Sequence, residues 1–257
     1  MSDEGSSAVK GDGEVGGTPE AQGNPVRALL FDVFGTVVDW RSGVIRDVTA
    51  AAARAAVPVD AARFADRWRA GYRPAMDLVR SGQLPWTKLD DLHRRVLDEL
   101  AAEFGLDGLP AADLDWLSTC WHRLDPWPDS VPGLTRLRSR YVLATMSNGN
   151  VALLVNMARR AGLPWDVILS AELFRRYKPD PGTYLGAAEL LSLDPAQLML
   201  VAAHNDDLTA AASLGLATAF LPRPTEYGPA QRKDLAPARD YTIVAADLTD
   251  LATQLST

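Results

Sequence analysis

The sequence predicts an α/β fold, in which a doubly wound, mostly parallel sheet carries a helical domain inserted after its first strand. Two observations lead to this prediction. From residue 128 onward, short apolar runs of strand length alternate with helical segments, as they do in βαβ units. Before that point a single apolar run, at 26–32, precedes a long stretch in which only helices are expected.

The first 25 residues are expected to form a disordered tail. They contain six glycines, five acidic residues and no aromatic residue, so they bury too little surface to offset the entropy of ordering them. Order is expected from residue 26. The run 26–32 is almost entirely apolar, which is typical of a strand covered on both faces in a parallel sheet.

The inserted helical domain is expected at 42–127, which leaves 26–41 and 128–257 as the α/β core. Four helices are expected in the insert. Their expected beginnings are Ser42 as the N-cap of a helix near 43–57, Asp60 for a helix toward Ser81 interrupted by Pro74, the residue after Thr87, and the residue after Pro110.

The alternation of strands and helices in the second half defines the rest of the core. The expected strands are 141–146, 166–169, 198–203 and 217–221, and the expected helices between them are 150–161, 181–192 and 207–214.

Composition narrows the class of protein. The chain has 257 residues, a net charge of −7 and one cysteine, Cys120, so an intrachain disulfide framework is excluded. The acidic balance argues against a nucleic-acid or anionic membrane partner. No apolar run approaches the roughly 20 residues of a membrane span, and the acidic start does not resemble a signal peptide. We therefore expect a cytoplasmic protein.

Polar side chains follow four of the predicted strands at the points where these strands end. In open parallel sheets, ligands bind beside the carboxyl ends of the strands, so these side chains are expected to meet at one rim. They are Asp32 after the first strand, Ser147 and Asn148 after the second, Lys178 beyond the third, and His204, Asn205, Asp206 and Asp207 after the fourth. One aspartate at a strand end is more often a cap, but four complementary groups favour a catalytic site.

These residues carry a resemblance to the haloacid dehalogenase superfamily. The chain contains Asp32-x-x-x-Thr36, Ser147-Asn148-Gly149, Lys178-Pro179 and Asp206-Asp207, in the order of that superfamily's four motifs. The resemblance covers about residues 26–250. It implies a Rossmann-like core, and it identifies the inserted helices as a cap domain.

The residue two positions after Asp32 distinguishes the branches of this superfamily. Its phosphatases carry a second aspartate there, which protonates the leaving oxygen, whereas this chain has Phe34. A phosphatase without that acid would lose the roughly 10²–10⁴-fold contribution of general acid catalysis. A halide leaves without a proton. The sequence therefore resembles the type II 2-haloacid dehalogenases, and the spacing from Lys178 to Tyr184 and Asp207 is similar to theirs.

The resemblance implies a role for each matching residue. Asp32 is the expected nucleophile, Thr36 positions it, and Lys178 neutralises it. Ser147 and Asn148 are expected to hold the substrate carboxylate, and Tyr184 to support the Lys178–Asp207 pair. An arginine of the cap should reach the substrate; Arg69, which follows Trp68, matches the family position, and Arg41 is the rival.

The fourth motif departs from the better-known members, which have a serine and, two residues later, an asparagine. Here these places hold Ala202 and His204, followed by Asn205 as an expected substrate contact. An imidazole beside an aspartate can accept a proton from water near neutral pH. His204 is therefore a candidate base, and the sequence leaves open whether His204 or Asp207 activates the hydrolytic water.

The expected reaction is hydrolytic dehalogenation of short 2-haloalkanoic acids to 2-hydroxy acids through an aspartyl ester. Haloacetates, fluoroacetate among them, and 2-halopropionate are the expected substrates. No cofactor or metal is expected, the only expected partner is the haloacid, and a homodimer is left open. Two alternatives remain: a Mg²⁺-dependent phosphatase of a small acid such as phosphoglycolate, and a non-catalytic member that uses the fold for binding.

Overall fold

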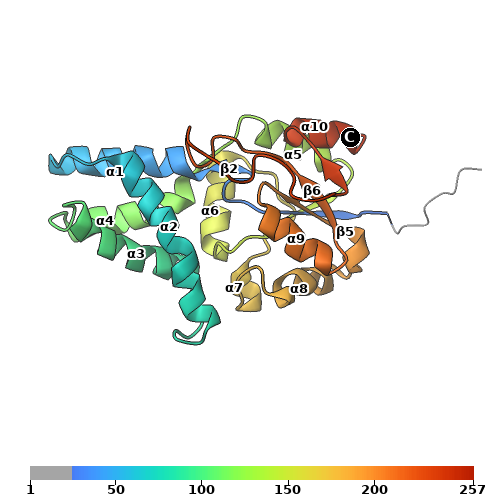
Figure 1. Ribbon diagram of the computed structural model, residues 1–257, viewed down its shortest axis with the longest axis horizontal. Coiled ribbons are helices and arrows are strands. Elements are labelled where there is room, and N and C mark those ends of the chain that lie inside the picture. Colours follow the sequence, from blue (N-terminus) through green and yellow to red (C-terminus); the bar gives the residue numbers. More distant parts are fainter. Residues whose placement is uncertain (1–24) are drawn as a thin grey trace, which may run out of the picture.

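A five-stranded parallel sheet forms the centre of the molecule (Figure 1). The computed structural model describes residues 25–257. The strands lie in the order β4–β1–β5–β6–β7, and every neighbouring pair is parallel. Their bounds are β1 Ala28–Phe31, β4 Val142–Thr145, β5 Leu198–Ala202, β6 Ala217–Phe220 and β7 Ile243–Val244. The prediction of a mostly parallel, Rossmann-like sheet is confirmed.

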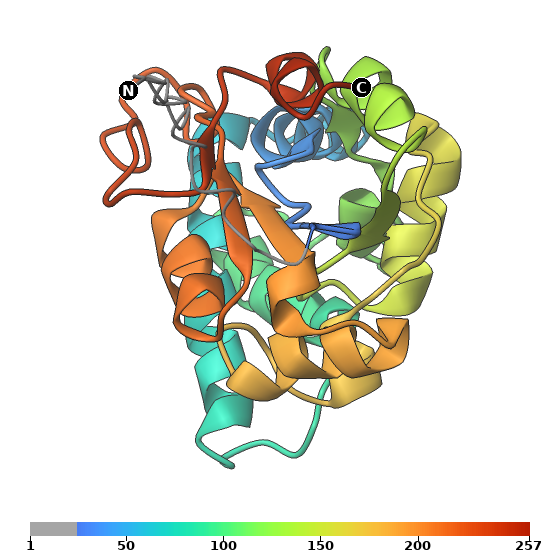
Figure 2. The same ribbon diagram turned by 90° about the vertical axis from the view of Figure 1, so that its right-hand side faces the viewer.

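Helices cover both faces of this sheet (Figure 2). Side chains of β1 alternate between the two faces: Leu29 and Phe31 enter one apolar cluster, and Ala28 and Leu30 enter the other. The first cluster includes residues of α5 Ser130–Leu137, α6 Val151–Ala161 and α10 Leu248–Gln254. The second includes residues of α8 Pro181–Leu191 and α9 Asn205–Ser213, and the short helix α7 Ala171–Phe174 precedes α8. The sheet is thus doubly wound.

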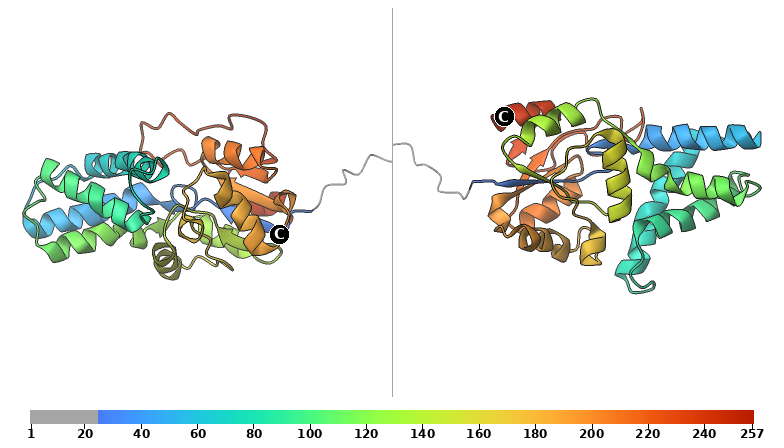
Figure 3. Two further views of the ribbon diagram at one scale, coloured as in Figure 1. Left: turned by 90° about the horizontal axis from the view of Figure 1, so that it is seen from below. Right: turned by 180° about the vertical axis from the view of Figure 1, so that it is seen from behind.

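The inserted helices project from one end of the sheet as a cap (Figure 3). Two short strands, β2 Val38–Asp39 and β3 Asp125–Pro126, pair antiparallel where the chain enters and leaves the cap. Between them lie α1 Trp40–Ala55, α2 Ala61–Arg80, α3 Leu89–Glu103, α4 Ala111–Ser118 and the 3₁₀ turn η1 Thr119–Arg123. No helix within 25–257 is long and apolar enough to cross a membrane.

Two cap helices differ from the expected ones. The first helix begins at Trp40, and its N-cap is Asp39 rather than Ser42, because the Asp39 carboxylate accepts the backbone N–H of Ser42 at 3.0 Å. The second helix runs through Pro74 without the expected interruption. Trp68 and Met76, one on each side of Pro74, are buried in the cap, so packing holds the helix together across the missing hydrogen bond.

The core also contains differences. Residues 166–169 form one isolated bridge to β4, between Val167 and Ala144, rather than a strand, and the Asp166 carboxylate accepts the Leu143 N–H. Helices α5 and α10 and strand β7 were not predicted. A Cβ atom at Gly133 in α5 would lie 2.6 Å from Leu248 in α10, so α5 owes its place to close packing rather than to helix propensity. The predicted disordered tail, apart from residue 25, lies outside the described residues.

Candidate active site

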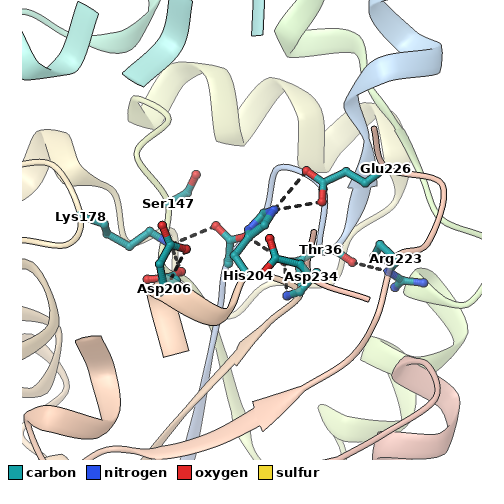
Figure 4. A network of polar contacts seen from close by, with 12 residues as sticks. Thr36, Ser147, Lys178, His204, Asp206, Arg223, Glu226 and Asp234 are labelled. Atoms are coloured by element: carbon teal, nitrogen blue, oxygen red, sulfur yellow. Dashed lines mark hydrogen bonds and ion pairs between the residues drawn. The ribbon is translucent and has the colours of Figure 1, made fainter. Parts of the chain in front are cut away.

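The carboxyl end of the sheet brings four charged side chains together, of which Lys178 and His204 are labelled in Figure 4. Asp32 directly follows β1, His204 and Asp207 follow β5, and Lys178 lies on the loop between α7 and α8. The Lys178 Nζ donates to Asp32 Oδ1 at 2.9 Å and to Asp207 Oδ2 at 2.5 Å. Buried cations and anions are stable only when paired in this way. The structure thus places these predicted residues in one cluster.

The turn after β1 holds the Asp32 carboxylate in place. Thr36 Oγ1 donates to Asp32 Oδ2 at 2.7 Å and accepts the Ala203 N–H at 2.9 Å. Gly35 has φ +87°, and a Cβ atom there would lie 2.2 Å from the Glu226 carboxylate. Glycine is needed at this position both for the backbone conformation and for the close approach of Glu226.

His204 lies between two carboxylates. Its Nδ1 is 2.9 Å from Asp32 Oδ2, and its Nε2 is 3.0 and 3.1 Å from the two oxygens of Glu226. Glu226 is buried and also accepts the Trp40 Nε1–H at 3.0 Å. Sequence reasoning missed Glu226. Its sequence signal is weak, because it lies on the loop after β6, five residues beyond the end of the last predicted strand.

Arg223 connects the loop that carries Glu226 to the nucleophile turn. Its Nε donates to the Thr36 carbonyl at 2.9 Å, and its two terminal nitrogens bind the Asp129 carboxylate at 2.7 and 2.8 Å. Such a bidentate pair fixes orientation as well as charge. Arg223 was also absent from the predicted site.

The remaining polar residues of the predicted site lie around this cluster. Tyr184 donates its hydroxyl to Asp207 Oδ1 at 2.6 Å, and Asn148 Oδ1 accepts the backbone N–H of Lys178 at 2.8 Å. Ser147 differs from the expectation. Its Oγ accepts the Gly149 N–H at 3.1 Å, which is a hydrogen bond within its own loop. The residue is fully buried and does not line the cavity.

The charges in the cluster shift one another. Burial disfavours the Asp32 carboxylate, but Lys178 and His204 together hold its pKa well below the usual range. Burial also works against a protonated His204, yet Glu226 and Asp32 raise the pKa of His204 well above its usual value. Burial raises the pKa of Asp207. Asp32 is therefore ionised at neutral pH, as a nucleophile must be.

A cavity of about 750 Å³ opens above the cluster, between α2 of the cap and the core. Two further basic side chains, Arg73 and Lys233, are among its lining residues. Phe34 and Asn148 line it beside Asp32. A volume of this order is typical of small-molecule sites.

The cavity contains the side chain of Arg69 and not that of Arg41. The Arg69 guanidinium lies over the rings of Tyr72 at 4.3 Å and Trp40 at 5.5 Å, and its buried Nη1 has no hydrogen-bond partner. Burial lowers the pKa of Arg69, but the neighbouring phenols and carboxylates raise it overall, so the cation persists. Arg41 instead binds Asp66 through two contacts, at 2.7 and 3.0 Å.

Asn205 lines the cavity but its amide is engaged elsewhere. Its Nδ2 donates to Asp234 Oδ1 at 2.9 Å, and its Oδ1 accepts the Ala238 N–H at 2.8 Å. These bonds anchor the long loop between β6 and β7, which also carries Glu226. Asn205, which the sequence predicts as a substrate contact, therefore anchors this loop instead.

Comparisons with known proteins agree with this geometry. A model of the haloacid dehalogenase-like hydrolase family matches residues 26–215. The (S)-2-haloacid dehalogenase 1 of Pseudomonas sp. strain CBS-3 is 27% identical over 248 residues, which cover 91% of this chain and 99% of that protein.

Two solved structures are more similar. An L-2-haloacid dehalogenase is 54% identical with a TM-score of 0.87, covering 90% of this chain and 99% of that chain. A defluorinating L-2-haloacid dehalogenase is 52% identical with a TM-score of 0.88, covering 90% and 96% of the two chains. The chain therefore belongs to the haloacid dehalogenase-like hydrolase family.

Proposed function

We propose that this protein is a hydrolase of carbon–halide bonds that converts short 2-haloalkanoic acids into 2-hydroxy acids through an ester on Asp32. One observation carries the proposal: the ionised Asp32 carboxylate faces a cavity whose wall also includes the cationic side chain of Arg69. A small anion with a leaving group at C2 satisfies both groups at once.

In the first step, an Asp32 oxygen attacks C2 of the substrate in line with the carbon–halogen bond. A C–O bond forms, the carbon–halogen bond breaks, and the halide leaves with its electron pair. Lys178 and Thr36 hold the carboxylate at 2.9 and 2.7 Å, and this fixed geometry lowers the entropic cost of the attack. Arg69 supplies positive charge to the substrate carboxylate or to the departing halide.

In the second step, water attacks the Asp32 carbonyl carbon, and the bond between that carbon and the bridging oxygen breaks, which releases the 2-hydroxy acid. We assign the base to His204 rather than Asp207, because His204 contacts Asp32 directly whereas both oxygens of Asp207 are bound by Lys178 and Tyr184. Glu226 acts as a positioning residue through its two contacts with His204 Nε2.

The phosphatase alternative receives less support from this site. Phe34 supplies no acid for a leaving oxygen. Both oxygens of Asp32 are bound by Lys178, Thr36 and His204, and two of these groups carry positive charge, so the surroundings of the carboxylate do not fit a further cation such as Mg²⁺.

Fluoroacetate is included among the proposed substrates. A defluorinating L-2-haloacid dehalogenase, 52% identical to this chain, is among the similar structures and supports this choice. A cytoplasmic location and a homodimer stay predictions.

A paired assay tests the proposal. Halide release from (S)-2-chloropropionate is compared with hydrolysis of p-nitrophenyl phosphate, each with and without EDTA. We expect halide release that EDTA leaves unchanged, that Asp32→Asn abolishes, and that the exposed control Asp107→Asn retains. Phosphate-ester hydrolysis that requires Mg²⁺, with no halide release, would support the phosphatase instead.

A further inference from the structure

The nucleophile, Asp32, is also one of the two carboxylates that accept hydrogen bonds from the His204 ring. The imidazole bridges Asp32 and Glu226, at 2.9 Å on the Nδ1 side and 3.0 Å on the Nε2 side. A ring with a carboxylate at each nitrogen can satisfy both only as the imidazolium, which donates from both nitrogens. The resting enzyme therefore contains a protonated His204.

The other charged groups around His204 do not replace either carboxylate. Lys178 binds Asp32 and Asp207 on the side away from the imidazole. Arg69, across the cavity, and Tyr227 are the other titratable neighbours of Glu226. Asp32 is thus one of two negative charges in direct contact with the ring, and the only one that the reaction changes.

Ester formation removes that charge, because the attacking oxygen becomes part of a neutral ester. We propose that alkylation of Asp32 itself converts His204 from a proton-bound cation into the neutral base of the second step. This inference rests on the proposed function. It explains how a histidine held between two carboxylates becomes able to accept a proton only after the ester exists.

The proton balance is complete without another reactant. The first step consumes no proton, and the imidazolium then loses one proton to solvent. In the second step neutral His204 accepts a proton from the attacking water, while the other water proton reaches the released alkoxide. Asp32 returns as a carboxylate and His204 as an imidazolium, so the single net proton of the reaction leaves between the two steps.

The size of the switch follows from the distance between the charges. Two unit charges about 4 Å apart, at an effective dielectric constant of about 20, interact strongly enough to move a pKa by roughly three pH units, or a thousandfold in proton affinity. Neutralising Asp32 also leaves Lys178 less compensated, which acts in the same direction.

The switch can be measured without substrate, because Asp32→Asn carries the charge of the ester state. The ring nitrogens are titrated by ¹⁵N NMR in the wild type, Asp32→Asn and the matched control Asp207→Asn, which removes a carboxylate bound to Lys178 but not to His204. The chain has three histidines, which simplifies assignment. Buried His93, whose pKa is lowered to about 3, and His122 report whether each variant is folded.

We expect His204 to remain protonated well above neutral pH in the wild type and in Asp207→Asn, and to titrate roughly three pH units lower in Asp32→Asn. Asp32→Ala should behave alike if the asparagine variant does not fold. Titration of His204 at the same pH in the wild type and the Asp32 variants would overturn the inference. Halide release by the wild type is a separate test: if it fails, the proposed function fails and the titration stands.

Discussion

Arg69 supplies the cation that the substrate requires, and its removal should be costly. A buried charge-assisted hydrogen bond contributes about 1.5–3 kcal/mol, and truncating one partner of a desolvated pair costs about 2–5 kcal/mol. Arg69 lines the cavity and stays cationic, so its charge is expected to face the substrate carboxylate or the departing halide. Arg69→Ala should therefore lower kcat/KM by roughly 30- to 5000-fold.

Arg41→Ala is the matched control. Arg41 lies in the first turn of α1, in the same cap, but its guanidinium binds Asp66 and does not line the cavity. The Asp66 side chain is 48% exposed, and such pairs contribute about 0–1 kcal/mol. We expect less than about a fivefold change in kcat/KM. Arg69→Lys should recover part of the loss, since it keeps the charge without the planar fork.

The assay is steady-state halide release from (S)-2-chloropropionate, with circular dichroism to show that each variant is folded. If Arg41→Ala were the more damaging change, or if Arg69→Ala retained wild-type kcat/KM, the placement of the substrate cation would be wrong, whereas the family membership would not be affected.

Three further predictions address other parts of the site. His204→Asn should complete the first step and accumulate the Asp32 ester, visible as a mass increase of the protein, and full steady-state turnover would argue against His204 as the base. Because Lys178, against the effect of burial, lowers the pKa of Asp32, the ester-forming rate in single-turnover experiments should stay constant as pH falls from 7 to about 5; a decline centred near pH 6 would contradict an ionised nucleophile. Asp129→Ala should destabilise the fold by about 3 kcal/mol in urea denaturation, because it leaves the Arg223 guanidinium, whose side chain is 8% exposed, without its carboxylate. Arg223 lowers the pKa of Asp129 despite burial, so this stabilisation is present above about pH 4 and lost as pH falls further; an unchanged denaturation midpoint would refute the role.

Local sequence patterns were sufficient to predict the elements that bring Asp32 and Lys178 together. The strand before Asp32 is apolar over its whole length, and the Lys178 loop precedes a helix with a proline in its first turn, so each signal lies within a few residues. The parallel order of the strands then places their carboxyl ends at one rim without any information from distant residues.

The parts that were missed depend on contacts between distant segments. Glu226 reaches His204 from a long loop without regular structure, and Arg223 is fixed by Asp129, which is 94 residues away in the sequence. Helix α5 contains a proline and a glycine, and it is stabilised by close packing, because Gly133 has no side chain and lets Leu248 of α10 approach its backbone. Ser147 had the expected motif, but its hydroxyl bonds within its own loop, which only the backbone geometry reveals.

A single turnover in water enriched in oxygen-18, with enzyme in excess of 2-chloropropionate, tests the covalent mechanism most directly. Because Asp32 forms the new C–O bond with its own oxygen and water then attacks its carbonyl carbon, we expect lactate with unlabelled hydroxyl oxygen and the heavy isotope in the peptide that contains Asp32. Heavy oxygen in the lactate hydroxyl, with none in that peptide, would show that water attacks C2 directly and would contradict an ester on Asp32.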